Sequence, residues 1–320
     1  MEPLIELIAV QKYYPVSRGF FKRKDLTVKA VDDIDMVIHR GETLGIVGES
    51  GCGKSTLGRL ILRLEEPTRG KILYAGQDLA SFSPGRLRKL RARLSIIFQD
   101  PYASLNPRKS VYSIIAEGIR IHRLSARSGL RRRVIDLLGQ VGMSEDALER
   151  FPHEFSGGQR QRIGIARALA LSPELIIADE PVSSLDVSIQ AQIINILMSL
   201  KERFGLTYVF ISHDLSVVRY MSDRVGVMYL GKIMELSGKD ELYEKPLHPY
   251  TAALLSAVPT IRGDERKQRI ILRGDIPSPI FVPTGCRFHT RCPEAQGICS
   301  QETPPLLDKG GGRLCACHFR

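Results

Sequence analysis

Short apolar runs alternate with segments of helical spacing along most of the chain. Runs long enough for buried strands lie at residues 42–47, 94–98, 175–180 and 206–212. The spacing of apolar residues between these runs predicts helices at residues 56–62, 84–94, 160–171 and 187–204. Because strands that alternate with helices usually pair in parallel, the pattern predicts a mainly parallel sheet with helices on both faces.

Further short strands flank this pattern. Residues 4–10 and 28–38 alternate between apolar and polar positions and predict antiparallel strands, separated by a basic insertion at residues 15–24. Residues 71–74 predict another strand between two turns. Two final short strands are predicted at residues 224–229 and 232–236.

The segment from residue 100 to residue 151 is expected to change from irregular to helical. Pro101 and Pro107 each restrict the residue before them, so residues 100–107 are not expected to remain regular. Residues 111–151 are predicted to be predominantly helical. Apolar residues with helical spacing support this prediction, at Val134, Leu137, Leu138 and Val141.

Residues 48–55 read Gly-Glu-Ser-Gly-Cys-Gly-Lys-Ser and lie between the first buried strand and a predicted helix. This is the GxxxxGKS pattern of a phosphate-binding loop, in the context that the pattern requires. The glycines let the backbone approach phosphate oxygens, while N–H groups, the helix N-terminus and the Lys54 ammonium supply positive charge. Ser55 can offer its hydroxyl to Mg²⁺. We therefore expect a nucleoside triphosphate at this loop.

Three later segments add chemistry that suits a nucleotide. The apolar run at residues 175–180 ends in two acids. Asp179 can orient Mg²⁺ through its water shell, and Glu180 can align the attacking water or accept its proton. His213 follows the next strand, where a donor to the γ-phosphate would lie. Ser156, followed by two glycines, opens a helix and forms a second anion-binding end.

Composition sets broad limits. With 320 residues, of which 43% are hydrophobic, the chain can bury one large core and a smaller appendage. The first residues lack the pattern of a signal peptide and no run is long enough to span a membrane, so we expect a cytosolic chain. The net charge of +11 suits nucleic acid, an anionic membrane surface or an acidic protein. The excess cations cluster at residues 22–24, 86–93 and 131–133, without the interleaved aromatic residues of a base-stacking surface.

With these motifs in order, residues 4–240 closely resemble the nucleotide-binding subunit of an ABC transporter. The matching motifs are the Walker A loop at Gly48–Thr56, the Q-loop residue Gln99, the signature at Phe155–Gln159, the Walker B strand at residues 175–180, the D-loop at Ser184–Asp186 and the switch histidine His213. The resemblance implies an α/β P-loop NTPase fold with a RecA-like, mainly parallel core. It also implies an antiparallel β subdomain, a helical signature subdomain at about residues 101–160 and a small C-terminal extension at residues 241–320 that contains cysteines.

The resemblance also assigns roles to individual residues. Catalysis is expected of Glu180, His213 and Gln99, and Mg²⁺ binding of Ser55, Gln99 and Asp179. The adenine base is expected to stack on Tyr14, with Tyr13 as the alternative, although either ring could equally be packing. The remaining residues expected to bind ATP are Gly48, Glu49, Ser50, Gly51, Cys52, Gly53, Lys54, Thr56, Ser156, Gly157, Gly158, Gln159 and Asp186.

In this family two ATPase subunits pair head to tail, so the signature residues of one chain are expected to serve the nucleotide of its partner. A narrower resemblance, carried by residues 98–108, 152–169 and 246–259, points to the dipeptide, oligopeptide and nickel importer group. It implies a second, non-identical ATPase subunit, two transmembrane permease subunits and an extracytoplasmic solute-binding protein, with this chain peripheral on the cytoplasmic side of the inner membrane. The His-Pro-Tyr-Thr sequence at residues 248–251 is the most telling marker, and by itself it predicts only a surface helix broken by proline.

Cysteines cluster in the last part of the chain. In a cytosolic protein, such clustering favours metal or cluster ligation over disulfides, although the spacing is that of neither a common zinc ribbon nor a ferredoxin. The tail resembles the C-terminal region of the same importer group, which implies a [4Fe-4S] cluster, with Cys315 as a possible substitute ligand. Zinc, with His289 or His318, and free thiols remain alternatives. The four implied ligands are Cys286, Cys292, Cys299 and Cys317.

The leading hypothesis is therefore an ATPase subunit that powers import of peptides or a related small solute. The alternative is a soluble ABC ATPase that acts on nucleic acid or ribosomes, which the positive net charge would suit. The importer-type tail and the absence of a second ATPase domain, a long coiled coil or an inserted DNA-binding module favour the transporter, so no nucleic-acid partner is expected. The sequence does not identify the solute.

Overall fold

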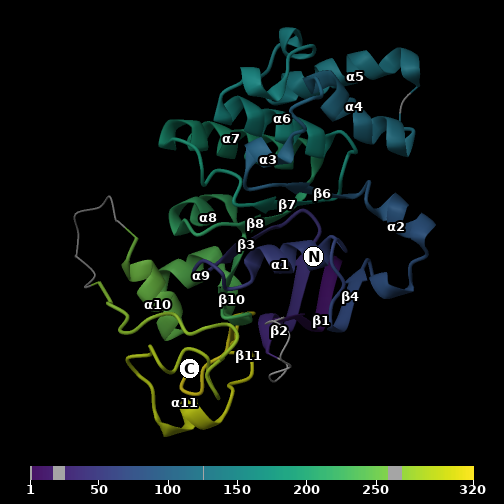
Figure 1. The fold of residues 1–320 in the computed structure, drawn as a ribbon. Coiled ribbons are helices and arrows are strands. Elements are labelled where there is room, and N and C mark those ends of the chain that lie inside the picture. Colours follow the sequence, from purple (N-terminus) through teal and green to yellow (C-terminus); the bar gives the residue numbers. More distant parts are fainter. Residues whose placement is uncertain (1, 17–25, 125, 259–268) are drawn as a thin grey trace. The chain divides into compact units, whose positions relative to one another are not determined.

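The computed structural model describes residues 2–16, 26–124, 126–258 and 269–320 (Figure 1). The basic cluster at residues 22–24 and most of the basic insertion lie outside these ranges. The chain divides into two compact units. We call Met1–Glu2, His39–Thr43 and Leu79–Ile211 the signature unit, and Pro3–Ile38, Leu44–Asp78 and Ser212–Arg320 the phosphate-loop unit.

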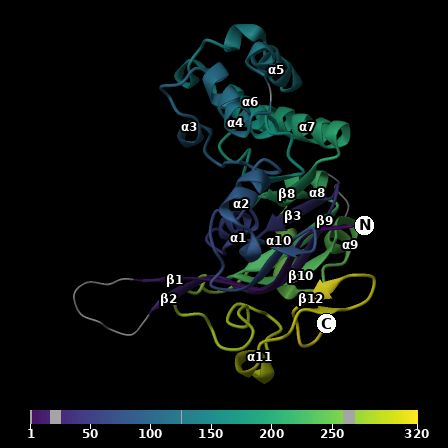
Figure 2. The ribbon, with the colours of Figure 1, turned by 90° about the vertical axis from the view of Figure 1, so that its right-hand side faces the viewer.

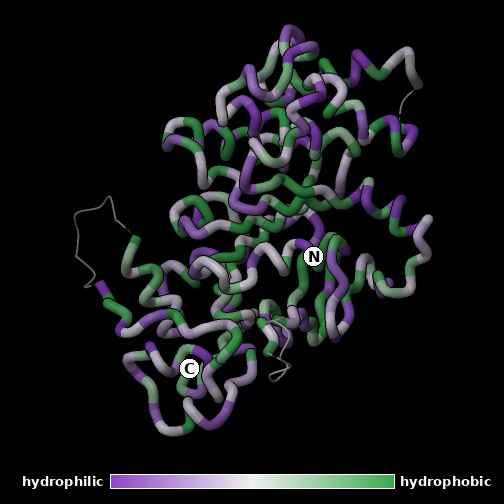
Figure 3. The backbone as a smooth tube through the Cα atoms, viewed as in Figure 1, coloured by the Kyte–Doolittle hydropathy of each residue, from purple (hydrophilic) through white to green (hydrophobic). Residues whose placement is uncertain are grey.

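The signature unit contains a parallel sheet. Its strands, in spatial order, are β8 (Thr207–Ile211), β7 (Leu175–Asp179) and β6 (Leu94–Ile97). Every residue of β7 and β8 is buried, as expected for parallel strands covered on both faces. Figure 3, which colours the backbone by hydropathy, is mostly green where these strands lie. The parallel pairing that the apolar runs predict is confirmed.

Helices make up most of the rest of the signature unit. The region predicted to be helical, residues 111–151, contains α4 (Val111–His122), α5 (Arg127–Gln140) and the short 3₁₀ turn η2 (Glu145–Ala147), and a second 3₁₀ turn, η3 (Pro152–Glu154), follows it. Other helical elements of this unit are η1 (Leu79–Ser81), α2 (Pro84–Leu90), α6 (Gly157–Leu169) and α7 (Val187–Phe204). The apolar residues that predicted helix in α5 and just beyond it, Val134, Leu137, Leu138 and Val141, are all buried.

One short helix departs from the sequence prediction. Residues 101–104 form helix α3 (Pro101–Ser104) instead of an irregular segment. Proline is compatible with the first position of a helix, and the Asp100 side chain accepts hydrogen bonds from the amides of Tyr102 and Ala103. The helix ends at Ser104, and the backbone of Leu105 that follows is extended.

The phosphate-loop unit has a mixed sheet. Strand β3 (Thr43–Val47) pairs in parallel with β9 (Arg224–Tyr229), and β10 (Lys232–Gly238) continues the sheet in the antiparallel sense. Two short strands of the C-terminal extension follow: β12 (Leu314–Cys315) pairs with β10, and β11 (Leu307–Asp308) pairs with β12. The helices are α1 (Lys54–Ile61), α8 (Leu215–Met221), α9 (Lys239–Glu244), α10 (Pro249–Ser256) and α11 (Gly297–Gln301).

A second sheet of the phosphate-loop unit has the order β2, β1, β4 and β5. The strands are β2 (Thr27–His39), β1 (Pro3–Pro15), β4 (Arg69–Tyr74) and β5 (Gln77–Asp78). The β1–β4 and β4–β5 pairs are antiparallel. Figure 2 shows β1 and β2 as long neighbouring strands, and the last part of the C-terminal extension, in yellow, with its strand β12 beside β10. Within the described ranges, no helix is both long and apolar enough to cross a membrane.

Candidate nucleotide site

The phosphate loop leaves the end of β3 and enters α1. Gly48 and Gly53 have positive φ angles of 151° and 107°, which residues other than glycine rarely adopt. A Cβ atom at Gly48 would collide with the carbonyl oxygen of Met228 in β9, and one at Gly53 with that of Ala30 in β2. The backbones of two neighbouring strands therefore lie so close to the loop that these two positions have no room for a side chain.

The Lys54 side chain links the two ends of the loop by hydrogen bonds. This side chain is buried, and Nζ donates to the carbonyl oxygens of Gly48 at 2.8 Å and Glu49 at 3.1 Å. The ammonium thus lies over the loop at the start of α1, whose first N–H groups add positive partial charge. Cys52 is buried in the same loop, and burial raises the pKa of its thiol, which therefore stays neutral. The loop therefore has a fixed backbone and the positively charged Lys54 ammonium, and both features suit the binding of a polyphosphate.

The two tyrosines that end β1 have different neighbours. The hydroxyl of Tyr14 donates to Glu65, and Thr56, which follows the GKS of the loop, also hydrogen-bonds it. The Tyr13 hydroxyl instead donates to Asp32 of β2. Successive side chains of a strand point to opposite faces, which explains the difference. Of the two tyrosines, Tyr14 is the one whose hydroxyl contacts Thr56, the residue directly after the GKS of the loop.

His213 follows β8 and is held next to β3. The amide of Ser212 donates to the carbonyl of Ile46 in β3 at 3.2 Å, and the Ser212 hydroxyl accepts from the amide of Asp214 at 3.0 Å. Asp214 in turn caps α8. The exposed His213 therefore sits in a turn that is tied to the strand leading into the phosphate loop.

In the signature unit, β7 ends in the two acids that the sequence singles out. Asp179 is buried at the last position of the strand, and Glu180 is the first residue beyond it. Glu180 has a positive φ of 46°, a conformation that costs about 1 kcal/mol or more in a residue other than glycine. Its amide donates to Ile211 of β8 at 2.9 Å, which holds the backbone there. Its carboxylate accepts a hydrogen bond from the Gln99 side chain at 2.9 Å.

The signature residues form the N-terminus of α6. Ser156 is the N-cap: its hydroxyl accepts from the Gln159 amide at 3.3 Å, and the Gln159 side chain accepts from the Ser156 amide at 3.0 Å. This reciprocal capping box orders the exposed motif. Gly158 is buried because α7 packs on it, and a Cβ atom there would lie 2.5 Å from Cγ2 of Ile189. Asp186, exposed at the N-cap of α7, completes the set of predicted residues in this unit.

The structure also identifies two residues at the loop that sequence reasoning missed. The Glu49 amide donates to the hydroxyl of Tyr250 at 3.1 Å, and Arg291 forms two hydrogen bonds with the Glu49 carboxylate. Tyr250 belongs to the His-Pro-Tyr-Thr sequence, which is not on a surface helix as predicted: His248, Tyr250 and Thr251 are buried in and just before α10. That sequence was the available signal, whereas nothing local marks Arg291.

The cysteine prediction needs a correction. The four predicted ligands line one small cavity beside Phe288 and His289, but no group of His, Cys, Asp or Glu in the described part of the chain is arranged to hold a metal ion. The prediction of an iron–sulfur cluster is therefore wrong for this structure. Burial raises the pKa of Cys286 to about 11 and also raises that of Cys292, so both thiols are neutral in this structure. All six cysteines are free thiols.

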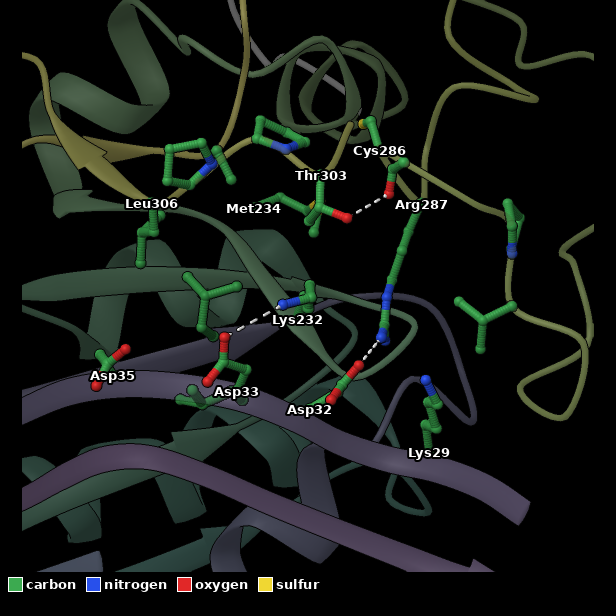
Figure 4. A pocket seen from close by; sticks show the side chains of 18 of the residues that line it. Lys29, Asp32, Asp33, Asp35, Lys232, Met234, Cys286, Arg287, Thr303 and Leu306 are labelled. Atoms are coloured by element: carbon green, nitrogen blue, oxygen red, sulfur yellow. Dashed lines mark hydrogen bonds and ion pairs between the residues drawn. The ribbon is translucent and has the colours of Figure 1, made fainter. Parts of the chain in front are cut away.

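A larger cavity of about 810 Å³ lies elsewhere in the phosphate-loop unit, between β2, β10 and the C-terminal extension (Figure 4). Its lining carries both signs of charge. Arg287 reaches from the extension to Asp32 of β2, and Lys232 lies 3.9 Å from Asp33. The first pair links the extension to β2, and the second links β10 to β2.

The fold, the phosphate loop and the signature helix together define an ATP-binding cassette. Residues 31–183 match the family model for the ABC transporter, and residues 234–299 match that for the C-terminal region of oligopeptide/dipeptide transporters. Among solved structures, the post-hydrolysis dimer of the ATP-binding cassette MJ0796 bound to ADP and Pi is 28% identical, with a TM-score of 0.66. That match covers 74% of this chain and 99% of the cassette.

Relatives that match along nearly the whole chain show to which group of ATP-binding cassettes the chain belongs. The oligopeptide transport ATP-binding protein AppF of Bacillus subtilis is 57% identical over 99% of this chain and 98% of its own. The dipeptide transport ATP-binding protein DppF of Escherichia coli is 49% identical over 99% of this chain and 94% of its own. The chain belongs to the ABC transporter family, within its group of oligopeptide and dipeptide transport ATP-binding proteins, and it is an ATPase.

Proposed function

We propose that this chain powers the import of oligopeptides or dipeptides across the cytoplasmic membrane. The observation that carries the proposal is the 57% identity with an oligopeptide transport ATP-binding protein over nearly the whole of both chains. The match of residues 234–299 to the oligopeptide/dipeptide transporter C-terminal region supports the same substrate class.

The transporter that we propose contains two permease subunits, an extracytoplasmic peptide-binding protein and a second, non-identical ATPase subunit. The two ATPases pair head to tail, so that Ser156–Gln159 of this chain complete the nucleotide site of the partner. The exposure of Ser156 and Gln159 at a helix N-terminus supports this arrangement, as does the dimeric state of the related cassette MJ0796. This chain then lies on the cytoplasmic side of the membrane as a peripheral subunit.

The site residues keep the roles that their chemistry favours. Ser55, Asp179 and Gln99 offer oxygen atoms, the ligands that Mg²⁺ prefers. Bound Mg²⁺ would neutralise charge that develops on the phosphates. Glu180 aligns the attacking water, His213 donates to the γ-phosphate and Tyr14 stacks on the adenine. The hydrogen bond between Gln99 and Glu180, and the contact of Tyr14 with Thr56, support these assignments.

The test is transport by the purified complex in proteoliposomes, with radiolabelled dipeptides, longer peptides and a nickel complex as probes. We expect the peptide-loaded binding protein to stimulate ATP hydrolysis, and peptide to enter only with ATP present. The same complex with Glu180→Gln is the control that should neither hydrolyse ATP nor accumulate peptide. Stimulation by the nickel complex alone would overturn the substrate class. Salt-sensitive binding of DNA or ribosomes without any permease would favour the alternative of an ATPase acting on nucleic acid.

A further inference from the structure

The phosphate loop of this chain contains an acid where it must attract an anion. Glu49 is the second residue of the loop, one position after Gly48. A carboxylate several ångströms from a polyphosphate repels it by roughly 1–2 kcal/mol per pair of charges at the effective dielectric of a protein surface. The loop therefore needs either a compensating cation or a way to hold this carboxylate aside.

Arg291 of the C-terminal extension meets both needs. Its two terminal nitrogens donate to the two carboxylate oxygens of Glu49, at 2.7 and 3.0 Å. This fork-to-fork geometry fixes the direction of both side chains. The Arg291 side chain is only 8% exposed and that of Glu49 is 21% exposed, so water screens the pair weakly. The hydrogen bonds to Glu49 raise the pKa of the guanidinium, which keeps its charge at any physiological pH.

Tyr250 holds the backbone of the same residue. Its hydroxyl accepts the hydrogen bond of the Glu49 amide, and its ring is fully buried. The ring packs in a tilted contact against Tyr229 of β9 and Phe288 of the extension, with centroids 4.8 and 5.1 Å away. Rigid aromatic packing of this kind places the hydroxyl without a large loss of side-chain entropy.

The extension is also anchored close to this contact, through Arg287. Arg287, four residues before Arg291, pairs with Asp32 of β2 and also donates to the carbonyl of Leu230. The next amide, that of Gly231, donates to the carbonyl of Cys52 in the phosphate loop at 2.9 Å. The loop is therefore bonded at Glu49 and at Cys52 to a framework that includes residues more than 200 positions later.

We propose that Arg291 and Tyr250 are positioning residues of the phosphate loop, so that the C-terminal extension completes the ATP site of its own chain. Arg291 neutralises Glu49 and holds its carboxylate away from the phosphates, and Tyr250 fixes the peptide that begins the loop. The proposal concerns ATP binding and not the chemical step, because neither residue belongs to the set that aligns water.

The decisive experiment is a charge rescue on the full chain. Arg291→Gln leaves Glu49 uncompensated, and we expect it to weaken binding of a fluorescent ATP analogue by about tenfold. In the assembled transporter the KM for ATP should rise by a similar factor, with kcat little changed. Adding Glu49→Gln removes the carboxylate charge and should restore affinity to within about twofold. Arg320→Gln is the matched control, since Arg320 pairs with Glu294 in the same extension and does not touch the loop.

Glu49→Gln alone gives a prediction of opposite sign that does not depend on the folding of the Arg291 variant. It leaves an uncompensated cation beside the loop, so ATP should bind at least as tightly as to the unaltered chain. Raising the salt concentration should shrink the differences between the variants, because ions screen partly exposed charges. Tyr250→Phe, which keeps the ring, should weaken ATP binding severalfold because the Glu49 amide loses its acceptor.

Two outcomes would overturn the proposal. If Arg291→Gln weakens ATP binding and the second change fails to restore it, Arg291 acts only through the stability of the extension. If neither Arg291→Gln nor Tyr250→Phe changes ATP affinity, the loop needs no support from the extension. Neither outcome would affect the proposed substrate class, which the transport assay tests separately.

Discussion

The side-chain amide of Gln99 donates a hydrogen bond to the carboxylate of Glu180, with 2.9 Å between Nε2 and Oε2. The two residues are 81 positions apart in the sequence and follow β6 and β7, which are adjacent parallel strands. The carboxyl ends of adjacent parallel strands meet at one edge of the sheet, which explains why the two side chains are neighbours. A displacement of Gln99 would therefore directly change the hydrogen bonding of Glu180, the acid that we expect to align water.

Glu180→Gln should bind ATP normally and hydrolyse it at least about a hundredfold more slowly, because an amide cannot accept the proton of the attacking water. Glutamine retains a side-chain oxygen that can accept the hydrogen bond from Gln99, so the geometry should survive. Equilibrium binding of an ATP analogue and release of phosphate by the assembled complex measure the two quantities. Hydrolysis at the normal rate would mean that another group, or the site of the partner subunit, carries turnover.

Lys54→Ala should weaken ATP binding itself, by at least about tenfold, because the loop loses a full positive charge and the donor to two of its carbonyls. The same binding assay distinguishes this effect from that of Glu180→Gln. A variant that binds ATP as tightly as the unaltered chain would show that the loop does not hold the phosphates.

Two glycines of α6 should respond oppositely to alanine. At Gly158 a methyl group would lie 2.5 Å from the Ile189 side chain, whereas at Gly164 nothing lies within 4 Å. We expect Gly158→Ala to lower the free energy of unfolding by about 1–3 kcal/mol because α7 must shift. Gly164→Ala should raise it by about 0.5–1 kcal/mol because alanine favours the helix. Urea unfolding of both variants measures the difference, and equal stabilities would contradict the packing described here.

His248 should make the fold sensitive to acid. Burial, with a smaller contribution from Arg320, lowers the pKa of His248 from 6.5 to about 4. The folded chain therefore binds fewer protons than the unfolded chain between these values, and its stability falls as the pH drops from 6.5 towards 4. The loss should approach about 3 kcal/mol. Neutral Nδ1 accepts the hydrogen bond of the Tyr250 amide, so protonation also removes the cap of α10.

Thermal unfolding between pH 4 and pH 7 tests this prediction. His248→Asn keeps a capping oxygen without titrating in this range, so its stability should vary less with pH. An unchanged pH dependence in that variant would assign the acid sensitivity to other groups.

The sequence predicts most of the fold because local patterns carry it. The apolar runs that become β7 and β8 are buried on every side, and such runs are readable without knowledge of their partners. Helix α3 was missed for a local reason. By itself Pro101 indicates only a constraint on the residue before it, whereas with Asp100 as the N-cap the same proline starts a helix.

The residues of the ATP site can be predicted only in part from the sequence, for a different reason. Gly48, Lys54 and Glu180 lie in short motifs whose spacing is itself the signal. The contact of Glu49 with Arg291 joins residues 242 positions apart, and a pair so distant leaves no periodicity in a single sequence. The cysteine pattern led to the wrong prediction of an iron–sulfur cluster, because spacing along the chain does not show where the thiols point or whether they are protonated. Cys286 lies with the others at one cavity, yet no metal-binding group forms among the described residues.

The short strand β12 has a consequence beyond the site. It pairs with Glu235 and Leu236 of β10, on the side of that strand that does not face β9. A chain shortened after residue 240 would lose β12 and expose an open sheet edge, together with the buried Glu235 carboxylate. Open edges recruit other strands, and such a fragment should aggregate instead of behaving as a smaller ATPase. We therefore expect the extension also to protect the subunit against self-association, because β12 covers the edge of β10.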